Sequence, residues 1–439
     1  MDTLISNVTV VTMNPRMEVL FGAYIGIDGG KIVRIAKTAP AETPKTIIDG
    51  TGMVAMPGLV NCHTHLATTA LRGLFDELPE KEALERLLQC EAKMDSRCAK
   101  AAVTLGIAEC LRFGITSVSD LYYFPDVTAQ AVADAGMKAN IALSAYRFID
   151  ENEDFDFDTD EQCQELARVC QKWHGYDDGR IKIDAGIYAE YTGNHKLWEG
   201  LAAFAKENAL GIQLHLSQTG EEVESCLDRT GLSPAQLLDC HGMFSVPATA
   251  AGCGYFSEED RALLGKRKAS CVALPLAAAK AGQKSAAIAD CVKTGMNVAL
   301  GTDGAAQWGS MDLFEVMRGA VLANGAGQGS TPLPLSAALM MATVCGARAQ
   351  GRAAECGILE AGMDADIVLI DFSAPHLIPC HNAVNALVSA AKGGDVAMTM
   401  VRGKILYQNG QFPTIDLKTA VEELMQYAIP KLLEAPKAQ

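Results

Sequence analysis

The chain has 439 residues, and 37 Lys and Arg against 53 Asp and Glu give it a formal net charge of -16 at pH 7. Proteins that bind phosphate backbones need a clustered excess of basic side chains, so this composition excludes nucleic acid as an expected partner. Hydrophobic residues make up 49% of the chain. That is enough for a large core, and the length fits a (β/α)8 barrel of about 250 residues with a smaller unit beside it.

The N-terminal segment and the cysteines indicate the compartment in which we expect the protein. Its first residues, MDTLISNVTVVTMN, alternate polar and apolar side chains and lack the basic start and unbroken apolar run of a secretory signal. No later stretch offers about 18 uncharged apolar residues, the length that spans a bilayer. The 14 Cys are scattered without a CxxC pair, which is typical of reduced thiols. We therefore expect a soluble cytoplasmic protein with no membrane partner.

Residues 1–56 have the pattern of short β-strands. The run TLISNVTVVTM alternates polar and apolar residues. In AYIGIDGGKIVRIAK, the sequence Asp28-Gly29-Gly30 favours a hairpin turn, because glycine adopts a positive φ without strain. This segment predicts one part of a small β-sheet domain.

Residues 57–354 alternate short apolar runs with helical stretches such as residues 127–135. Continuous apolar runs are typical of a parallel sheet buried on both faces, with helices as the crossovers. We expect a (β/α)8 barrel, in which the chemistry lies at the C-terminal ends of the strands. The eight runs are GLVNCHTH, ITSVSDL, KANIALSAY, IKIDAGIYA, GIQLHLS, ATAAGCG, ASCVALPL and NVALGTD.

Residues 355–413 return to the strand pattern of the N-terminus. The runs DADIVLIDF and VAMTMVRGKILYQNGQF are strand-like, and Asn409-Gly410 predicts a turn. Because we expect no helix between these strands, the two chain ends predict one composite β-sandwich into which the barrel is inserted. Residues 414–439 have helical periodicity and predict a C-terminal helix.

Four polar side chains at the ends of predicted barrel strands suit a metal. His63 and His65 end the first run, and residues two apart on a strand face the same side about 6.6 Å from each other. His215 lies in the fifth run and Asp303 ends the eighth. Three imidazoles and one carboxylate predict a single divalent ion, with zinc as the first choice and iron or manganese as alternatives.

Several motifs resemble a known family. MPGLVNCHTHL, LRGLFDELPEKEAL, HLSQT and NVALGTDGAA are similar to the amidohydrolase superfamily, in the branch of methylthioadenosine and S-adenosylhomocysteine deaminases and related chlorohydrolases. The resemblance covers essentially the whole chain. It implies that His63, His65, His215 and Asp303 hold one catalytic metal. It also implies that Glu82 takes the place of a glutamate that contacts the ribose; the alternative is a solvated helix carboxylate.

The resemblance further implies a reaction. Metal-bound hydroxide would hydrolyse a C–N bond, by deamination, in a nucleoside-like or heterocyclic small molecule, and Asp303 would be both metal ligand and proton acceptor. Proteins of this type commonly form homodimers or higher homo-oligomers.

The chain departs from the family pattern at four places. Gln218 stands where the family has the glutamate of an HxxE motif, and an amide cannot transfer a proton at neutral pH. Gly252 replaces the histidine after strand six, Tyr188 replaces the histidine after strand four, and ALPLAAA from Ala273 replaces an HNPxSN-like segment. A general acid/base step is worth roughly 10²- to 10⁴-fold in rate, so these changes bear on whether turnover is retained.

Three interpretations stay open. In the first, Glu190, Asp120 or Asp303 supplies the missing proton and the pocket, with Tyr188 among its substrate contacts, takes an altered substrate. In the second, the chain is a slowed purine nucleoside deaminase. In the third, it is a metal-containing binding or regulatory paralogue with little turnover. Arg147, which ends the third run, is placed to hold a substrate carboxylate, with a structural salt bridge as the alternative.

Overall fold

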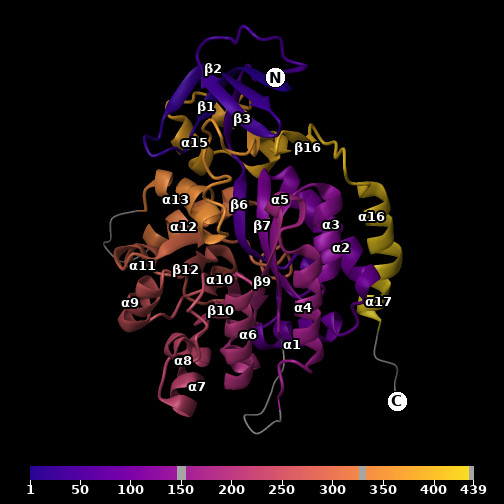
Figure 1. Cartoon of the computed structure of the whole chain (residues 1–439), viewed down its shortest axis with the longest axis vertical. Coiled ribbons are helices and arrows are strands. Elements are labelled where there is room, and N and C mark those ends of the chain that lie inside the picture. Colours follow the sequence, from indigo (N-terminus) through magenta and orange to yellow (C-terminus); the bar gives the residue numbers. More distant parts are fainter. Residues whose placement is uncertain (146–154, 326–332, 435–439) are drawn as a thin grey trace.

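A computed structural model describes residues 1–145, 155–325 and 333–434. Two eight-stranded sheets organise the chain (Figure 1). One sheet takes strands from both ends of the chain in the order β16-β15-β14-β5-β1-β2-β3, with β4 paired to β1. Its strands are β1 (Thr3–Val11), β2 (Val19–Asp28), β3 (Lys31–Ala36), β4 (Thr46–Asp49), β5 (Met53–Pro57), β14 (Ile367–Asp371), β15 (Val396–Val401) and β16 (Lys404–Gln408).

The two chain ends join where β14 runs antiparallel to β5, with Ile367 opposite Pro57. The expected hairpin connects β2 and β3, and Gly29 and Gly30 adopt φ values of 54° and 79°. The predicted small β-domain, built from both ends of the chain, is therefore confirmed. Its strands form a single hydrogen-bonded sheet.

The expectation of no helix between the C-terminal strands was wrong. Helix α15 (Ala383–Ser389) lies between β14 and β15, and the Asn382 side chain accepts a hydrogen bond from the Asn385 N–H at its start. Its residues Val384 and Leu387 are buried. A helix of 7 residues spans about two turns, too short for its periodicity to stand out in the sequence.

The second sheet is the predicted barrel. Its strands follow chain order from β6 to β13, and every neighbouring pair is parallel. Strands β6, β7 and β8 are buried along their whole length, which explains their continuous apolar runs. The strands are β6 (Leu59–Thr64), β7 (Ile115–Tyr122), β8 (Lys138–Leu143), β9 (Ile181–Gly186), β10 (Ile212–Leu216), β11 (Ala248–Gly252), β12 (Ser270–Ala273) and β13 (Asn297–Leu300).

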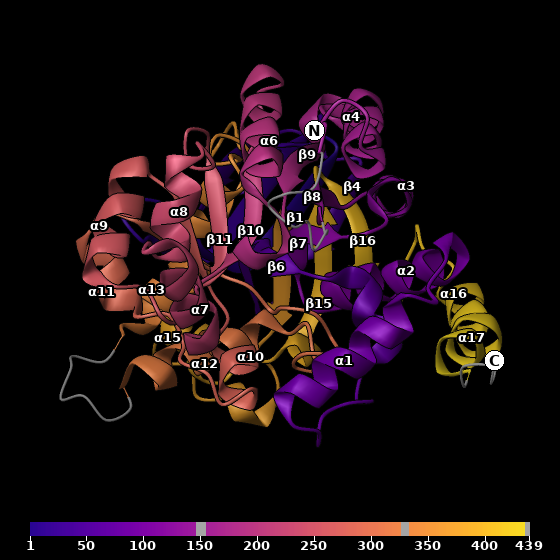
Figure 2. The same ribbon diagram turned by 90° about the horizontal axis from the view of Figure 1, so that it is seen from below.

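Helices surround the barrel strands, as the view from below shows (Figure 2). They are α1 (Glu80–Glu91), α2 (Ser96–Arg112), α3 (Pro125–Ala135), α4 (Glu161–Trp173), α5 (Tyr176–Gly179), α6 (His195–Glu207), α7 (Gly220–Thr230), α8 (Pro234–Cys240), α9 (Glu258–Arg267), α10 (Pro275–Lys280), α11 (Ile288–Lys293), α12 (Leu313–Gly325), α13 (Leu335–Met341) and α14 (Val344–Ala349). Helix α4 shows how they form: the Asp160 carboxylate accepts from the Cys163 N–H at its start, and Cys163, Leu166 and Cys170 are buried on one face.

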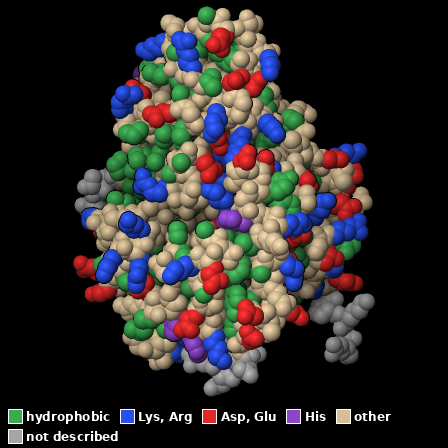
Figure 3. All heavy atoms as spheres, in the orientation of Figure 1, with side chains coloured by type: hydrophobic (Ala, Val, Ile, Leu, Met, Phe, Trp, Pro, Cys, Tyr) green, Lys and Arg blue, Asp and Glu red, His purple; other side chains and the backbone are tan. Residues whose placement is uncertain are grey.

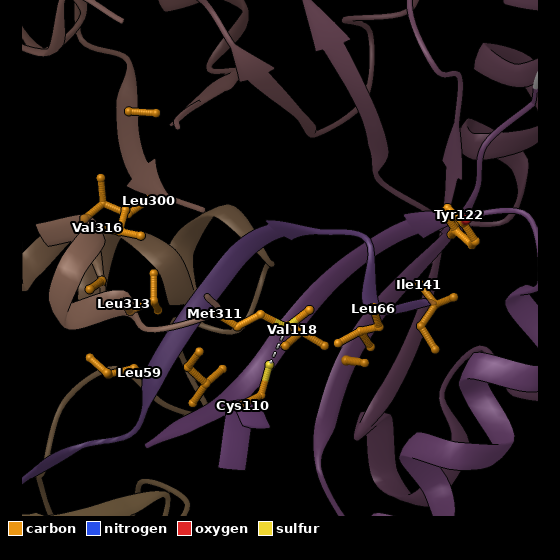
Figure 4. Packing of buried hydrophobic residues seen from close by; sticks show 14 of the residues in the cluster. Leu59, Leu66, Cys110, Val118, Tyr122, Ile141, Leu300, Met311, Leu313 and Val316 are labelled. Atoms are coloured by element: carbon orange, nitrogen blue, oxygen red, sulfur yellow. Dashed lines mark hydrogen bonds between the residues drawn. The ribbon is translucent and has the colours of Figure 1, made fainter. Parts of the chain in front are cut away.

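The barrel closes between its first and last strands through the Asn61 side chain. The Asn61 amide donates to Thr302 Oγ1 at 2.7 Å, and its oxygen accepts from the Thr302 N–H at 3.1 Å. The core around β6 and β7 is apolar: Leu59, Leu66 and Val118 pack together, and Cys110 contacts Met311 across 3.6 Å (Figure 4). This closure fixes the position of every strand end.

A buried ion cluster ties the barrel to the other sheet. Lys138, the first residue of β8, is fully buried, and its ammonium lies 2.7 Å from Asp364 and 2.6 Å from Asp366. Both carboxylates come just before β14. A buried charge is costly without its partner, so moving the two sheets apart at this contact would be unfavourable. The contact therefore holds the two sheets in one relative orientation.

The C-terminal segment folds as α16 (Leu417–Glu423) and α17 (Ile429–Leu433), joined by a π-helical turn over Leu424–Ala428 and lying along α2 (Figure 1). The division of the chain at residues 57, 355 and 414 stays a prediction. On the face in Figure 3, basic and acidic side chains are interspersed, unlike the clustered basic surface of a nucleic-acid-binding protein.

Candidate metal centre and active site

Four buried side chains meet at the C-terminal ends of the barrel strands. His63 lies in β6 and His65 directly follows it, while His215 lies in β10 and Asp303 follows β13. Their ligand atoms all lie within 4.8 Å of one another. The parallel barrel thus gathers residues that are far apart in the chain, as the strand-end pattern predicted.

The imidazole edges converge on one point. His63 Nε2 lies 3.0 Å from His215 Nε2, and His65 Nε2 lies 3.2 Å from Asp303 Oδ1. The His63 and His65 rings are nearly perpendicular, at 84°. Each ring therefore presents a nitrogen, rather than a face, to the shared centre.

Backbone carbonyls orient two of these rings. His65 Nδ1 donates to Leu121 O at 2.6 Å, and His215 Nδ1 donates to Tyr188 O at 2.7 Å. In a neutral imidazole with a proton on Nδ1, Nε2 carries the lone pair, which for His215 points to the centre. Burial lowers the pKa of His215 to about 4 and that of His63 well below its usual value. Both rings are consequently neutral, which is the form that binds a metal.

Asp303 carries the negative charge of the cluster. Burial acts to raise its pKa, but the hydrogen bond and charge of His65 outweigh burial and hold the Asp303 pKa well below its usual range. Burial likewise acts to lower the pKa of His65, and Asp303 reverses the net shift to a raised value. Asp303 adopts a left-handed φ of 62°, and its Oδ1 accepts from the Gly304 N–H at 2.8 Å. This strained conformation turns the carboxylate toward the histidines.

The donor set fits a divalent ion. Three imidazole nitrogens and one carboxylate oxygen suit borderline cations such as Zn²⁺, and the Nδ1 groups have the carbonyl partners that metal-binding histidines usually have. A small hollow with about 20 Å³ of free volume opens beside the cluster. Its lining combines His65 with aromatic, polar and α1 side chains: Thr68, Leu84, Leu87, Leu88, Glu91, Leu121, Tyr122, Tyr123, Ser144, Tyr188 and Gln307.

Of the three predicted substrate contacts, Tyr188 lines the hollow, Glu82 does not, and Arg147 is not described. Tyr188 lines the hollow, with its ring 4.7 Å from that of His215. Glu82 lies elsewhere: its carboxylate pairs with Arg86 at 2.7 Å, and both line a separate surface hollow on α1. The structure does not bring Glu82 to the metal cluster, because its place on α1 turns it away from the side that carries Leu87. Arg147 lies outside the described residues.

In the described part of the chain, no helix combines the length and apolarity needed to cross a membrane. The profile of the Amidohydrolase family matches residues 54–406. The chain belongs to the amidohydrolase family. It is 34% identical to a 5-methylthioadenosine/S-adenosylhomocysteine deaminase of Thermoanaerobacter pseudethanolicus, over 95% of this chain and 96% of that protein.

Other amidohydrolase relatives agree with this placement. A 5'-deoxyadenosine deaminase of Methanosarcina mazei is 34% identical over 97% of this chain and 98% of its own length. The crystal structure of an adenosine deaminase from Xanthomonas campestris, with bound zinc, superposes with a TM-score of 0.92 at 28% identity and covers 98% of each chain. The recognition of the superfamily from its motifs is confirmed.

Gln218 and Gly252, two departures from the amidohydrolase pattern, lie against each other. A Cβ on Gly252 would lie 3.0 Å from Gln218 Cβ and 3.1 Å from its Cγ. Gly252 also has a φ of 94°, which side chains rarely adopt. The Cβ and Cγ atoms of Gln218 thus lie tightly against the place where a side chain at position 252 would begin.

The two other acids considered as proton donors have different surroundings. Asp120 accepts from the Leu66 N–H at 2.7 Å, next to His65, and burial raises its pKa to about 6. Glu190 is buried and pairs with Arg229 of α7 at 2.5 Å. The hydrogen bond from Leu66, which directly follows His65, holds the Asp120 carboxylate beside the first strand's candidate ligands.

Glu91, Ser144 and Gln307 are among the lining residues of the hollow that were missed from the sequence. Ser144 directly follows β8, so the rule that singled out polar side chains at strand ends could have found it. Glu91 ends a helix and Gln307 lies in a loop. Neither position carries a strand-end signal.

Proposed function

We propose that this amidohydrolase deaminates a nucleoside-like or heterocyclic small molecule, with one zinc ion held by His63, His65, His215 and Asp303. The convergence of these ligand atoms within 4.8 Å, beside a hollow, is the observation that carries the proposal. The names of the relatives, which are deaminases of adenine nucleosides, favour the same substrate class.

The chain's own residues have defined tasks in this proposal. A divalent ion supplies, when bound, a Lewis acid and a means of acidifying water at neutral pH. Asp303, ionised at neutral pH, accepts the proton as the nucleophile adds to the carbon. Leu121 O and Tyr188 O keep the two imidazoles aligned. Tyr188 and Tyr122 shield the hollow from bulk water with their rings.

Protonation of the leaving nitrogen is the step for which Gln218 is unsuited. Asp120 is our candidate for this step, because burial brings its pKa to about 6, near the value that suits an acid at neutral pH. Asp303 is the alternative, since the proton that it accepts can be passed on.

A second candidate function is binding with little turnover. The residues Gln218 and Gly252 favour it, because they leave one side of the site without the acid and the histidine of the family pattern. In that case the protein would bind a small molecule and the metal without releasing ammonia.

Ammonia release from zinc-loaded protein tests the proposal. Adenosine, methylthioadenosine, S-adenosylhomocysteine, guanine and triazines form the panel, with chelator-treated protein as the control. We expect release from at least one compound, loss of release after chelation and recovery with zinc. Silence across the panel from fully metallated protein, together with measurable binding of a panel member, would favour the binding function instead.

We further propose a cytoplasmic homo-oligomer. All 14 cysteines are free thiols and most are buried, which suits a reducing compartment. Large apolar side chains such as Leu322 and Met425 are 72% and 60% exposed, and contact between copies would cover them. Light scattering of the purified protein measures the mass directly, and a monomeric mass would refute the oligomer.

A further inference from the structure

We propose that the wall of the hollow formed by Glu91, Ser144 and Gln307 binds a cationic, hydrogen-bond-donating group of the substrate and discriminates against neutral or anionic groups there. This inference rests on the proposed function in that it assigns the substrate class of the same site. It concerns residues other than the metal ligands and the predicted contacts.

Glu91 supplies the charge of this wall. It is the last residue of α1, and Tyr122 donates a hydrogen bond to its Oε1 at 2.7 Å. Tyr122 in turn lies beside the cluster, with its ring 6.2 Å from that of His65. Burial raises the pKa of the Glu91 carboxyl, and the hydrogen bond from Tyr122 and the charge of His65 act in the opposite direction. When ionised, the carboxylate only accepts hydrogen bonds, so it presents an acceptor to whatever enters the hollow.

Ser144 and Gln307 add polar atoms that have no partner. Ser144 is 2% exposed, and its Oγ is buried without a hydrogen bond to any described residue. Gln307 Oε1 is likewise buried and unpartnered within the described part of the chain. Buried polar atoms are nearly always hydrogen-bonded, so two unpartnered atoms on residues that line one hollow point to a ligand that completes them.

The location of Gln307 ties this wall to the metal centre. Its Oε1 and Thr68 Oγ1 occupy the space in which a side chain on Gly304 would begin, directly after Asp303. A ligand that reaches Gln307 therefore lies beside the metal cluster. The wall and the cluster belong to one binding space.

Aromatic rings complete an electron-rich lining. The Tyr122 and Tyr123 rings lie with their centroids 4.7 Å apart and their planes tilted by 42°, and Tyr188 lies by His215. Burial raises the pKa of Tyr122 and of Tyr188, so both phenols are neutral. Ring faces attract cations, and among the described lining residues there is no Lys or Arg to receive an anion. Carboxylate, amide oxygen and rings together favour a positively charged planar group.

Benzamidine and benzamide are the probes that test this selection. They have nearly the same shape, but benzamidine is a planar cation with N–H donors only, whereas benzamide is neutral. Calorimetric titration of zinc-loaded protein measures both affinities. We expect benzamidine to bind more tightly by about tenfold or more, in line with the strength of hydrogen bonds to charged groups.

Two variants of the same helix provide a matched comparison. Glu91→Gln removes the carboxylate from the hollow, while Glu85→Gln makes the same change on the outer side of α1, where Glu85 lines the separate surface hollow. We expect Glu91→Gln to abolish the preference for benzamidine and Glu85→Gln to keep it. Equal affinities for the two probes in the unaltered protein, or a preference that survives Glu91→Gln, would overturn the inference.

Ser144→Ala is the second variant, should Glu91→Gln fail to fold. It removes an Oγ that has no partner among the described residues, so it breaks no described contact. Benzamidine affinity should fall severalfold, and an unchanged affinity would overturn the role of this wall. Ammonia release is a separate readout. If benzamidine binding depends on Glu91 but no panel compound is deaminated, the proposed function fails and this inference stands. If a panel compound is deaminated but the two probes bind equally well, this inference fails and the proposed function stands.

Discussion

His63 Nε2 lies 3.0 Å from His215 Nε2, although 152 positions separate the two residues in the chain. Strands β6 and β10 bring them together, and Leu121 O and Tyr188 O orient the neighbouring imidazoles. Two buried neutral imidazole nitrogens lie this close to each other and near the Asp303 carboxylate. This grouping of possible metal ligands is the basis of the first prediction.

The double change His63→Ala with His65→Ala should remove the bound metal. It deletes two of four ligands, and the remaining pair cannot complete a tetrahedral site. Metal content per chain, measured by mass spectrometry after dialysis, checks this. His241→Ala, at a histidine that pairs with Glu199 near the surface, is the control and should retain metal. Unchanged metal content in the double variant would exclude these ligands.

Gln218→Glu should raise the rate of ammonia release. It restores an ionisable group after β10, and general acid/base catalysis is typically worth about 10²-fold or more. Gln89→Glu, on the exposed side of α1, makes the same chemical change away from the site and should leave the rate unaltered. A metal-loaded Gln218→Glu variant with no gain would show that another group already delivers the proton or that the pocket rejects the substrate tested.

Gly252→Ala should destabilise the protein by about 1–3 kcal/mol, the usual cost of an unfavourable backbone conformation. The reason is its φ of 94° together with a Cβ position 3.0 Å from Gln218 Cβ. Urea unfolding gives the free energy. Gly394→Ala is the control, because a Cβ there would meet nothing within 4 Å. Equal stability of the two variants would contradict the strain at position 252.

Lys138→Met should destabilise the protein by about 3–5 kcal/mol at neutral pH, because it removes the ammonium that pairs with buried Asp366 and one of the three cations beside Asp364, where Lys31 and Arg402 remain. Lys138 is fully buried, with Asp364 and Asp366 at 2.7 and 2.6 Å. Lys172→Met, at a half-exposed lysine that pairs with Asp126, should cost about 1 kcal/mol or less. Similar losses in the two variants would argue against the buried cluster.

The same cluster predicts a pH dependence. Burial acts to raise the pKa of Asp364, but Lys138 outweighs it and the pKa falls from 3.8 to about 2. A depressed carboxyl pKa stabilises the folded state above the unfolded value and loses this contribution as the pH falls through the folded value, here from about 4 to 2. The stability advantage over Asp364→Asn should be about 2 kcal/mol larger at pH 6 than below pH 2. Urea titrations across this range would contradict the assignment if the difference stayed constant.

The metal cluster could be predicted from the sequence because its residues sit at the ends of buried strands. His63, His215 and Asp303 each close an apolar run, and a parallel barrel places all such ends on one face. Glu82 could not be placed in the same way. Its neighbourhood depends on how α1 is rotated on the barrel, and that rotation results from packing of Leu87 and its neighbours against distant residues.

The local order of the chain by itself determined the two sheets and the candidate metal ligands, since hydrophobic periodicity and strand-end chemistry are properties of short segments. Only the tertiary structure decided that Glu91 of α1, Ser144 after β8 and Gln307 after β13 line one hollow. It also decided that Gln218 fills the space beside Gly252. These are contacts between segments far apart in the chain, and their geometry is set by the closure of the barrel and the packing of helices on it, which no local pattern encodes.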